Sequence, residues 1–477
     1  MRIARFGLAF ALFPSTAALA QVKGSDAVLR AIEARRDHYA GVAQRIWDFA
    51  EVGYQEVKSS ALLQSELTAA GFSVQAGVAD IPTAFVATFG SGKPVIAILG
   101  EFDALPGLSQ DRVPERKVLI EGGAGHGCGH HLFGTASAAA AVHVKEWMQA
   151  NGIRGTLRYY GTPAEEGGSG KVYMVRAGLF SDVDAVVAWH PGDRNQADAN
   201  STLANISAKF RFHGVSAHAA AAPERGRSAL DGVEAMTHMV NMMREHVPQD
   251  TRIHYVITAG GRAPNVVPDA AEVFIYARQS DMRVLDAVWE RIIAAARGAA
   301  MGTGTTVDFE TISAVYNVLP NEYLTGLQQK NLTRVGGITY TAEERAFAER
   351  IRASMSGDLL PLGSEATVIP WSTFAVDPAS TDVGDVSWTV PTVQLSAATW
   401  VPGTAAHTWQ AVASGGTSIG TKGMMVAAKT MALTTLDLFT DPSHLVKARA
   451  EFDRRRGPSF SYQTRLDRAK PALDYRK

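Results

Sequence analysis

The sequence predicts an α/β protein in which a mostly parallel sheet is flanked by helices and a smaller α+β domain is inserted into the chain. The sheet is indicated by three apolar strands that alternate with helices, each running directly into polar residues. The insertion is indicated by a change of apolar period near residue 203, after which the elements follow the order βαββαβ of a ferredoxin-like unit. At 477 residues, with 46% apolar and 19% charged residues, the chain is long enough for two or three domains.

The elements of the first 200 residues are recognised by their periodicity and by the glycines at their ends. Helices are expected at 26–50, 58–70 and 132–150. Apolar strands are expected at 94–100 (PVIAILG), 155–160 (GTLRYY) and 184–189 (DAVVAW). Because parallel strands end at the same edge of a sheet, the polar residues that follow them should gather there.

The inserted part begins with apolar residues at 206, 208, 210 and 212 that alternate with polar ones, which is typical of a half-buried strand. Its other elements are expected to be helices at 230–243 and 284–292 and strands at 253–258, 272–278 and 306–309. We therefore assign residues 203–318 to the inserted domain. Residues 21–202 and 319–477 then form the first domain.

The last part of the chain should complete the first domain. Thr341 and Glu344 form a capping box before a helix at 342–355, and a strand at 392–396 precedes a helix at 424–439. The tail after Asp441 is rich in arginine, which predicts a solvated surface segment without a binding role.

The first 20 residues predict a cleaved secretory signal. A basic start is followed by an apolar run at 6–13 and by Ala18-Leu19-Ala20, a small-x-small site that predicts cleavage after Ala20. The alternative is a membrane anchor, but this run is too short to span about 30 Å of hydrocarbon, and no membrane span is expected after its removal. The protein is therefore expected to be secreted or periplasmic. The formal charge of −1 argues against a nucleic-acid partner, and the single cysteine excludes an intrachain disulfide.

A glycine-rich loop carries the strongest chemical signal. The segment GHGCGHHLFGTAS (125–137) presents His126, Cys128, His130 and His131 just before a helix. Imidazole and thiolate together suit Zn²⁺ and similar metals, and glycines let closely spaced side chains converge. Without paired C-x-x-C motifs, a purely structural Cys₄ zinc site is excluded.

Adjacent carboxylates form the second signal. Glu165 and Glu166 in GTPAEEGGSG (161–170) follow a strand, and neighbouring side chains on extended backbone point in opposite directions. One carboxylate can therefore bind a metal while the other faces a substrate. Asp103, His190 and His407 follow other strands. Each alone would be a routine polar strand end, but together these donors favour a functional site.

The motifs GEFDALPG, GHGCGH, GTPAEEGGSGK, STDVGDVSW (380–388) and GTAAHTWQ occur in this order over nearly the whole mature chain. In this respect the sequence resembles the dinuclear metal amidohydrolases and carboxypeptidases, which include aminoacylases, hippurate and auxin-conjugate hydrolases and glutamate carboxypeptidases. The resemblance implies a catalytic domain with an inserted lid and dimerisation domain. It also implies two divalent metal ions, most often Zn²⁺ or Mn²⁺, with Co²⁺ or Ni²⁺ as further options, held by Cys128, His130, Glu166, His190 and His407.

The same resemblance implies the roles of the remaining residues. Cys128 would bridge the metals, Glu165 would be the general base and Asp103 would orient a ligand histidine. Glu101 stands where other branches of the family have a ligand histidine, and His131 stands where relatives of the cysteine type have Asp or Asn.

In the inserted domain, GVSAHAAAAPERGRSALD (214–231) resembles a family segment whose histidine reaches an active site, often that of a partner subunit. His218 would thus be an oxyanion donor in a homodimer. Asn265 and Arg278 are implied substrate contacts, and the guanidinium of Arg278 suits a substrate carboxylate.

These expectations describe an enzyme that cleaves the amide bond of small N-acyl or N-aroyl amino acids, with aminobenzoyl-glutamate-like compounds as the leading substrates. One alternative is a thiol amidase in which Cys128 attacks, but that mechanism leaves the conspicuous carboxylates and histidines without roles. The other alternative is a non-catalytic metal- or ligand-binding homologue.

Overall fold

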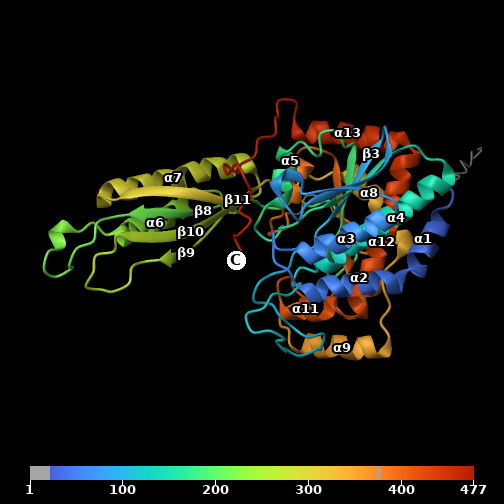
Figure 1. Ribbon diagram of the computed structural model, residues 1–477, viewed down its shortest axis with the longest axis horizontal. Helices are drawn as coiled ribbons and strands as arrows, with labels where there is room; N and C mark the ends of the chain where they lie inside the picture. Colours follow the sequence, from blue (N-terminus) through green and yellow to red (C-terminus); the bar gives the residue numbers. More distant parts are fainter. Residues whose placement is uncertain (1–21, 373–375, 477) are drawn as a thin grey trace, which may run out of the picture.

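The computed structural model describes residues 22–372 and 376–476. It confirms the predicted fold class: a mainly parallel sheet covered by helices, and a second, antiparallel sheet formed by residues 204–315. The two parts lie end to end, with the second sheet and its helices α6 and α7 at the left of Figure 1. The domain boundaries at 203 and 318 stay a prediction. The predicted signal sequence and its cleavage after Ala20 lie outside the described residues.

The large sheet has the strand order β1-β2-β4-β3-β5-β12-β6, and β7 pairs with β12. Strands β4, β3, β5, β12 and β6 run parallel, whereas β1, β2 and β7 pair antiparallel with their neighbours. The strands span Ser73–Ala76 (β1), Phe85–Ser91 (β2), Val95–Gly100 (β3), Gly155–Gly161 (β4), Ala185–Val187 (β5), His190–Gly192 (β6), Gln196–Asp198 (β7) and Thr392–Ala398 (β12). All residues of β3 and β5 are buried, as expected for strands covered on both faces.

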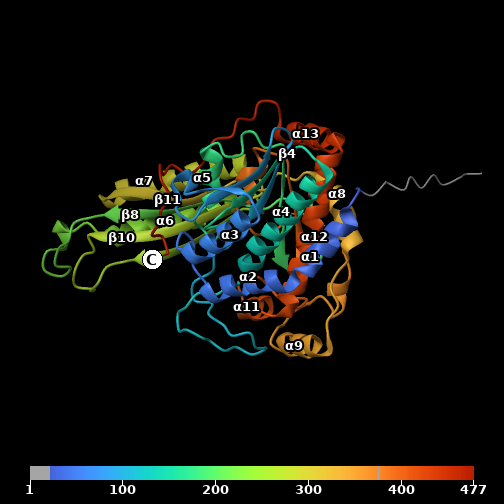
Figure 2. The same cartoon turned by 45° about the vertical axis from the view of Figure 1, so that its right-hand side comes forward.

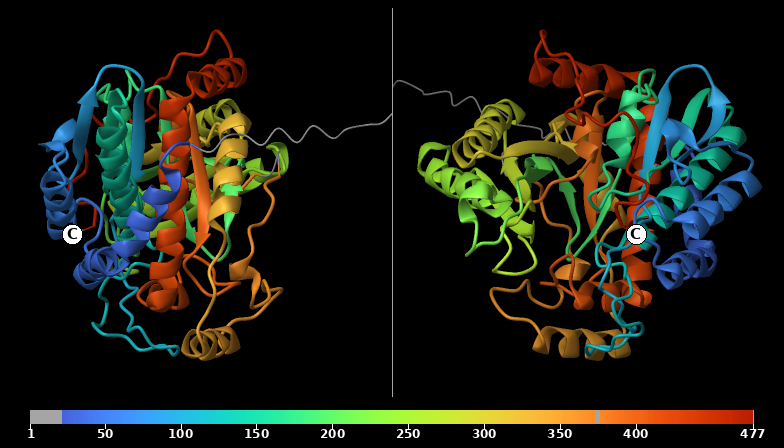
Figure 3. Two further views of the ribbon diagram at one scale, coloured as in Figure 1. Left: turned by 90° about the vertical axis from the view of Figure 1, so that its right-hand side faces the viewer. Right: turned by 60° about the vertical axis from the view of Figure 1, so that its left-hand side comes forward.

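Two long helices, α4 and α12, pack against each other and against the sheet, and Figure 3 shows them side by side in teal and red. The small side chains at 136–141 of α4 are buried and allow this close approach. The helices of this part are α1 (Ser25–Ala34), α2 (Arg36–Phe49), α3 (Val57–Ala69), α4 (His130–Asn151), α5 (Gly170–Arg176), α8 (Glu322–Val335), α9 (Ala342–Ala353), α10 (Val383–Ser387), α11 (Trp409–Gly415), α12 (Ser418–Thr440) and α13 (Pro442–Arg456). The predicted capping box of α9 is present.

The small sheet has the order β11-β8-β10-β9, in which all neighbours are antiparallel. Its elements are β8 (Ala204–His213), α6 (Ala229–Met243), β9 (Arg252–Ala259), β10 (Ala270–Gln279), α7 (Met282–Thr303) and β11 (Thr306–Val315). Helices α6 and α7 pack on the sheet and on each other, as Figure 2 also shows. The observed order β8-α6-β9-β10-α7-β11 is the predicted ferredoxin-like order.

Two local predictions were wrong. The helix expected over 26–50 is two helices, because the backbone leaves helical geometry at Arg35 (φ −103°, ψ 17°). The tail expected to be a solvated segment begins as helix α13, which buries Ala448 and Phe452, and then continues along the protein towards the large sheet's functional edge. Arg455 pairs with Glu451 and Arg465 with Asp286, so the high charge of the tail did not mean a solvated segment.

Among the described residues, no helix combines the length and apolar character needed to cross a membrane.

Candidate metal centre and active site

The carboxyl ends of the parallel strands bring the predicted polar residues together. Glu101 and Asp103 follow β3, Glu165 and Glu166 follow β4, and His190 begins β6, close to the end of β5. Cys128 lies just before α4, which begins at His130, and His407 lies after β12. The sheet topology thus explains why residues far apart in sequence share one site.

Two groups of three potential metal ligands share the thiol of Cys128. One group adds His130 and His190 to Cys128, and the other adds Glu166 and His407; within each group one ligand atom per residue lies within 4.8 Å of the others. The sulfur of Cys128 is 3.5 Å from Nε2 of His190, and Nε2 of His407 is 3.2 Å from Oε1 of Glu166. One thiol shared by a pair of imidazoles and by a carboxylate with an imidazole is an arrangement that can hold two cations.

Unsatisfied polar atoms test whether these residues fit metal ions. Nε2 of His130 and Oε1 of Glu166 are both buried, and among the described residues their nearest polar neighbours are other charged groups of this site, Glu101 and His407, without a well-formed hydrogen bond. Buried polar atoms are rarely left without a partner unless an ion or water completes them. The donors are thiolate, imidazole and carboxylate, which suit Zn²⁺ and Mn²⁺-type cations, so the residues fit a dinuclear metal site.

Asp103 supports two of the candidate ligands. Its Oδ1 lies 2.8 Å from Nδ1 of His130, and its Oδ2 accepts a hydrogen bond of 2.9 Å from the backbone N–H of Glu166. When Nδ1 of His130 donates to Asp103, the lone pair of Nε2 is left free for a metal. One carboxylate therefore orients both the imidazole and the loop that carries Glu166.

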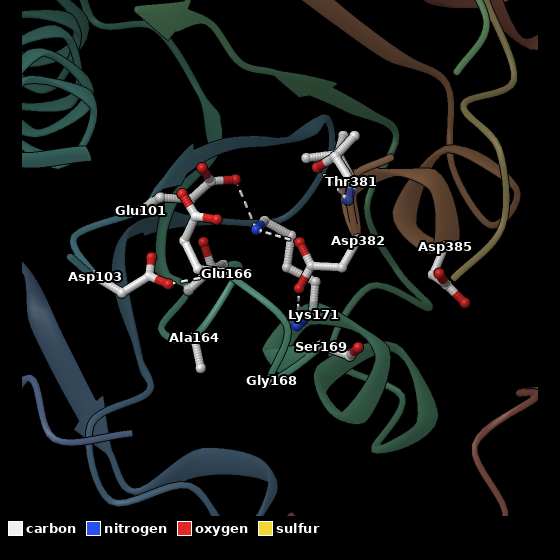
Figure 4. A network of polar contacts seen from close by, with 12 residues as sticks. Glu101, Asp103, Ala164, Glu166, Gly168, Ser169, Lys171, Thr381, Asp382 and Asp385 are labelled. Atoms are coloured by element: carbon white, nitrogen blue, oxygen red, sulfur yellow. Dashed lines mark hydrogen bonds and ion pairs between the residues drawn. The ribbon is translucent and has the colours of Figure 1, made fainter. Parts of the chain in front are cut away.

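A buried ion triad lies beside this site (Figure 4). The ammonium of Lys171 is 2.7 Å from Oε1 of Glu101 and 2.6 Å from Oδ1 of Asp382, and the three side chains are 0–1% exposed. Burial alone would lower the pKa of Lys171, but the two carboxylates outweigh it and hold the pKa above its usual range. The other oxygen of Glu101 lies 3.0 Å from Nε2 of His130, so the triad borders the metal ligands directly.

Glu165 belongs to the same group of charges. Burial, together with the carboxylates of Glu101 and Glu166, holds the pKa of Glu165 well above its usual range. One of its oxygens can also join Glu101 and His130 in a third group of possible ligands. A carboxylate with a raised pKa is a better proton acceptor, which suits a general base.

Burial also changes the pKa of Cys128. Removal from solvent and the nearby carboxylate of Glu166 hold the pKa of the thiol well above its usual range. A nucleophilic cysteine requires the opposite, a lowered pKa, so this environment does not favour a free thiolate. A cation bound at the sulfur would deprotonate the thiol outright.

Two histidines of the glycine-rich segment contact backbone carbonyl groups and not the candidate ligands. Nε2 of His131 lies 3.0 Å from the carbonyl oxygen of Gly415, and Nε2 of His126 lies 3.1 Å from that of Ile46. Burial lowers the pKa of His131 to about 3, so the ring is neutral and donates its proton to that carbonyl. His126 and His131 are in neither group of candidate ligands that contains Cys128.

A cavity of about 560 Å³ opens on the candidate ligands and extends to the second sheet. Cys128, Glu165 and His407 line one end. The second sheet contributes Tyr276 and Arg278 of β10, and the guanidinium of Arg278 donates to Oγ of Ser380 at 3.3 Å. A small molecule in this cavity would contact both parts of the chain.

His218 and Asn265 lie elsewhere, on exposed loops of the second part, and neither is among the residues that line this cavity. The two are neighbours, because the backbone N–H of Ala219 donates to the carbonyl of Asn265 at 3.0 Å. Nδ1 of His218 accepts hydrogen bonds from the N–H groups of Ala220 and Ala221, which leaves its proton on Nε2. Its Nε2 is therefore a hydrogen-bond donor on an exposed side chain.

Two contributors to this site were missed by reasoning from the sequence. Lys171 ends the motif GTPAEEGGSGK, but a lysine gives no sign of burial on its own. Arg476 lines the cavity and donates to the carbonyl of Glu166 at 2.6 Å, although it lies about 310 residues further along the chain. Neither pattern nor spacing signals such a distant contact.

Comparison with known proteins places this architecture in a family. The model of peptidase family M20/M25/M40 matches residues 97–356, and the chain belongs to this family. It is a hydrolase of the amidohydrolase type. A p-aminobenzoyl-glutamate hydrolase subunit from Escherichia coli is 44% identical over 447 residues, which cover 88% of this chain and 93% of that protein. The Xaa-Arg dipeptidase of Mus musculus is 29% identical over 437 residues, with coverage of 88% and 90%.

Solved structures share the fold at low sequence identity. A dinuclear metal-binding peptidase of the M20 family from Bacillus subtilis superposes with a TM-score of 0.57 at 17% identity, covering 85% of this chain and 99% of that one. An aminobenzoyl-glutamate utilization protein from Klebsiella pneumoniae gives the same TM-score at 19% identity, with coverage of 86% and 98%.

Proposed function

We propose that this protein hydrolyses the amide bond of N-acyl or N-aroyl amino acids, with aminobenzoyl-glutamate-like compounds as the leading substrates. The observation that carries the proposal is a pair of ligand groups sharing Cys128, beside the carboxyl group of Glu165, in one cavity. The activity of the Escherichia coli relative, a p-aminobenzoyl-glutamate hydrolase, supports the substrate class.

In this proposal, Cys128, His130 and His190 hold one divalent cation, and Cys128, Glu166 and His407 hold the other. Zn²⁺ or Mn²⁺ suits these donors best, and Co²⁺ or Ni²⁺ would also be accepted. When bound, two such cations lower the pKa of a shared water and polarise the amide carbonyl.

Glu165 is the proposed general base. Its carboxylate takes the proton of the attacking water and returns it to the departing nitrogen, because amide cleavage needs both transfers. Its raised pKa supports this role, since a carboxylate with an ordinary pKa would be a weaker acceptor for the proton of the attacking water. Asp103 keeps the imidazole of His130 in the required orientation.

Arg278 is the proposed reader of the substrate carboxylate. It lines the same cavity as the candidate ligands, with its guanidinium carbon 5.8 Å from the ring centroid of Tyr276. A guanidinium offers paired donors to a carboxylate. Arg278→Lys should raise KM for free amino-acid substrates more than for their esters, because a lysine cannot make the paired contact. Equal losses on both would remove this role.

We also propose that the inserted domain forms a homodimer in which His218 serves the partner's site, with Asn265 nearby as a substrate contact. The supporting feature is β9, the edge strand of the small sheet, where Val256 is 55% and Ile257 41% exposed. An apolar edge strand is a ready site for pairing with a second copy. His218 would donate the proton on Nε2 to the oxyanion.

Mixing two inactive variants tests this arrangement. His218→Ala and Glu165→Gln chains, combined by co-expression, should regain about a quarter of wild-type activity, since half the dimers are mixed and each has one intact site. If His218 acts within its own chain, the mixture stays inactive. Light scattering on the wild type gives the oligomeric state independently.

Export is the last part of the proposal. Residues 1–20 would direct secretion or transfer to the periplasm and be removed after Ala20. N-terminal sequencing of the protein recovered from the periplasm should begin at Gln21. A mature chain that begins at Met1 would contradict it.

The decisive experiment compares Glu165→Gln with Glu115→Gln, a substitution of an exposed glutamate that pairs with Arg350. Hydrolysis of aminobenzoyl-glutamate should fall by about 10²- to 10⁴-fold in the first variant only, while metal content stays near two ions per chain. Unchanged turnover in Glu165→Gln would remove the mechanism. Activity that survives metal stripping but not thiol alkylation would identify Cys128 as a nucleophile instead.

A further inference from the structure

The tail that follows α13, residues 457–476, crosses the molecule and ends at the candidate active site. Figure 1 shows the chain end, marked C, at the junction of the two parts. The tail forms no helix or strand, so side-chain contacts must hold its course. These contacts come from both parts of the chain.

On the side of the inserted part, three charged residues of the tail are anchored. Arg465 pairs with Asp286 of α7 at 2.5 Å, and Arg468 pairs with Glu310 of β11 at 2.9 Å. The carboxylate of Asp467 accepts a hydrogen bond from Oγ1 of Thr311 at 3.2 Å.

On the side of the large sheet, the backbone of the tail is held. The guanidinium of Arg176 donates to the carbonyls of Arg468 and Ala469 at 2.6 and 2.5 Å, and the amide of Gln55 donates to the carbonyl of Leu473 at 2.6 Å. The path of the tail is therefore determined up to the last described residues.

Those last residues contact the loop that carries the two adjacent glutamates. The hydroxyl of Tyr475 and the guanidinium of Arg476 both donate to the carbonyl of Glu166, at 3.1 and 2.6 Å. The ring of Tyr475 also packs against Tyr54, 5.6 Å between centroids, and the hydroxyl of Tyr54 donates to the carbonyl of Gly168 at 2.6 Å. Three donors thus hold two carbonyls of one short loop.

This loop needs support from outside. Ala164, Gly167 and Ser169 all have positive φ angles, of 58°, 94° and 57°. Two of these are not glycines, and each such residue costs about 1 kcal/mol or more, so it persists only when its surroundings impose it. The direction of the Glu165 and Glu166 side chains depends on this backbone.

We propose that Tyr475 and Arg476 are positioning residues for the catalytic loop: by binding the carbonyl of Glu166, they hold its carboxylate towards the metal ligands and that of Glu165 towards the substrate. The inference rests on the proposed function for its effect on turnover. Its effect on metal binding does not require any substrate to be known.

The test compares the double variant Tyr475→Phe/Arg476→Met with wild type and with Arg454→Met, an exposed arginine of α13 as the matched control. Competition between apoprotein and a chromophoric chelator measures Zn²⁺ affinity. The double variant should lose about 10- to 100-fold in affinity, as expected when support of a ligand is removed. Arg454→Met should match wild type.

Kinetics and rescue separate positioning from general stability. With aminobenzoyl-glutamate, kcat should fall in the double variant while KM and the Tm of the metal-free protein stay near the wild-type values, and Arg476→Lys should recover part of both kcat and Zn²⁺ affinity. Unchanged Zn²⁺ affinity in the double variant overturns the inference, as does a loss of affinity that accompanies a lower Tm of the metal-free protein and is not rescued by lysine. If wild type hydrolyses no amide, the proposed function fails, but the affinity comparison still decides this inference.

Discussion

Replacing Lys171 with methionine should cost the protein a large part of its stability. The substitution keeps the length of the side chain but removes the charge that lies 2.7 Å from Glu101 and 2.6 Å from Asp382. All three side chains are excluded from solvent, so water cannot compensate the carboxylates that remain. Removing one partner of a buried ion pair costs about 3–5 kcal/mol, and a typical domain is stable by only about 5–15 kcal/mol.

Urea unfolding at pH 8, with the metal content held constant, measures this cost. Lys429→Met is the matched control, because Lys429 pairs with Glu33 in a partly exposed position. Such a surface pair contributes about 0–1 kcal/mol. Adding Asp382→Asn to Lys171→Met should recover part of the loss, since one of the two uncompensated charges is then absent. If Lys171→Met unfolds like Lys429→Met, the ammonium does not neutralise the triad and the reasoning fails.

Three further predictions concern pH, packing and metal. Burial raises the pKa of Asp385 to about 7, so this carboxyl group binds a proton more tightly in the folded protein than in the unfolded chain. Its contribution to stability is therefore present below about pH 4 and is lost as the pH rises to 7. Asp385→Asn should flatten the decline of the unfolding free energy between pH 4 and 7, and an unaltered pH profile would contradict this. Gly384→Ala should destabilise by about 1–3 kcal/mol, measured by urea unfolding, because the added Cβ would overlap the carbonyl oxygen of Tyr316; wild-type stability would show that the backbone yields freely. Stripping the metals should lower Tm in scanning fluorimetry, and Zn²⁺ at about 100 times its Kd should restore about 2.7 kcal/mol for each site that it fills. An identical Tm before and after would argue against bound metal.

The sequence predicts the candidate site well where chemistry and topology coincide. Cys128 lies just before α4, His130 begins α4, Glu166 follows β4, and the carboxyl ends of parallel strands meet at one edge of the sheet. Apolar periodicity located the elements, because the order of apolar and polar residues shows whether a strand or helix buries one face or both.

The features that sequence could not predict depend on contacts between distant residues. Lys171 is buried only because Asp382, 211 residues away, and Glu101 supply opposite charges. Arg476 belongs to a tail whose composition is typical of a solvated segment, yet its guanidinium donates to the carbonyl of Glu166. Long charged side chains are usually exposed, so exposure is the natural expectation from sequence. It is wrong where the fold places an oppositely charged or hydrogen-bonding group beside the side chain.

The way the inserted part joins the rest of the chain keeps the proposed metal ligands and general base apart from the residues proposed to contact the substrate. Its first and last strands pair with each other, so that Asn205 lies opposite Val315, about 5 Å away. The chain enters and leaves the inserted part at these two neighbouring positions. An exchange of the residues between them would also have to keep the contacts of Arg278 with Ser380 and of the tail with α7 and β11. The six residues proposed for metal binding and proton transfer all lie outside this module, whereas Tyr276 and Arg278 lie inside it. Evolution, or a designer, could therefore change what is recognised by substituting the module while the metal ligands and Glu165 stay where they are, provided that His218 and the residues that anchor the tail are kept.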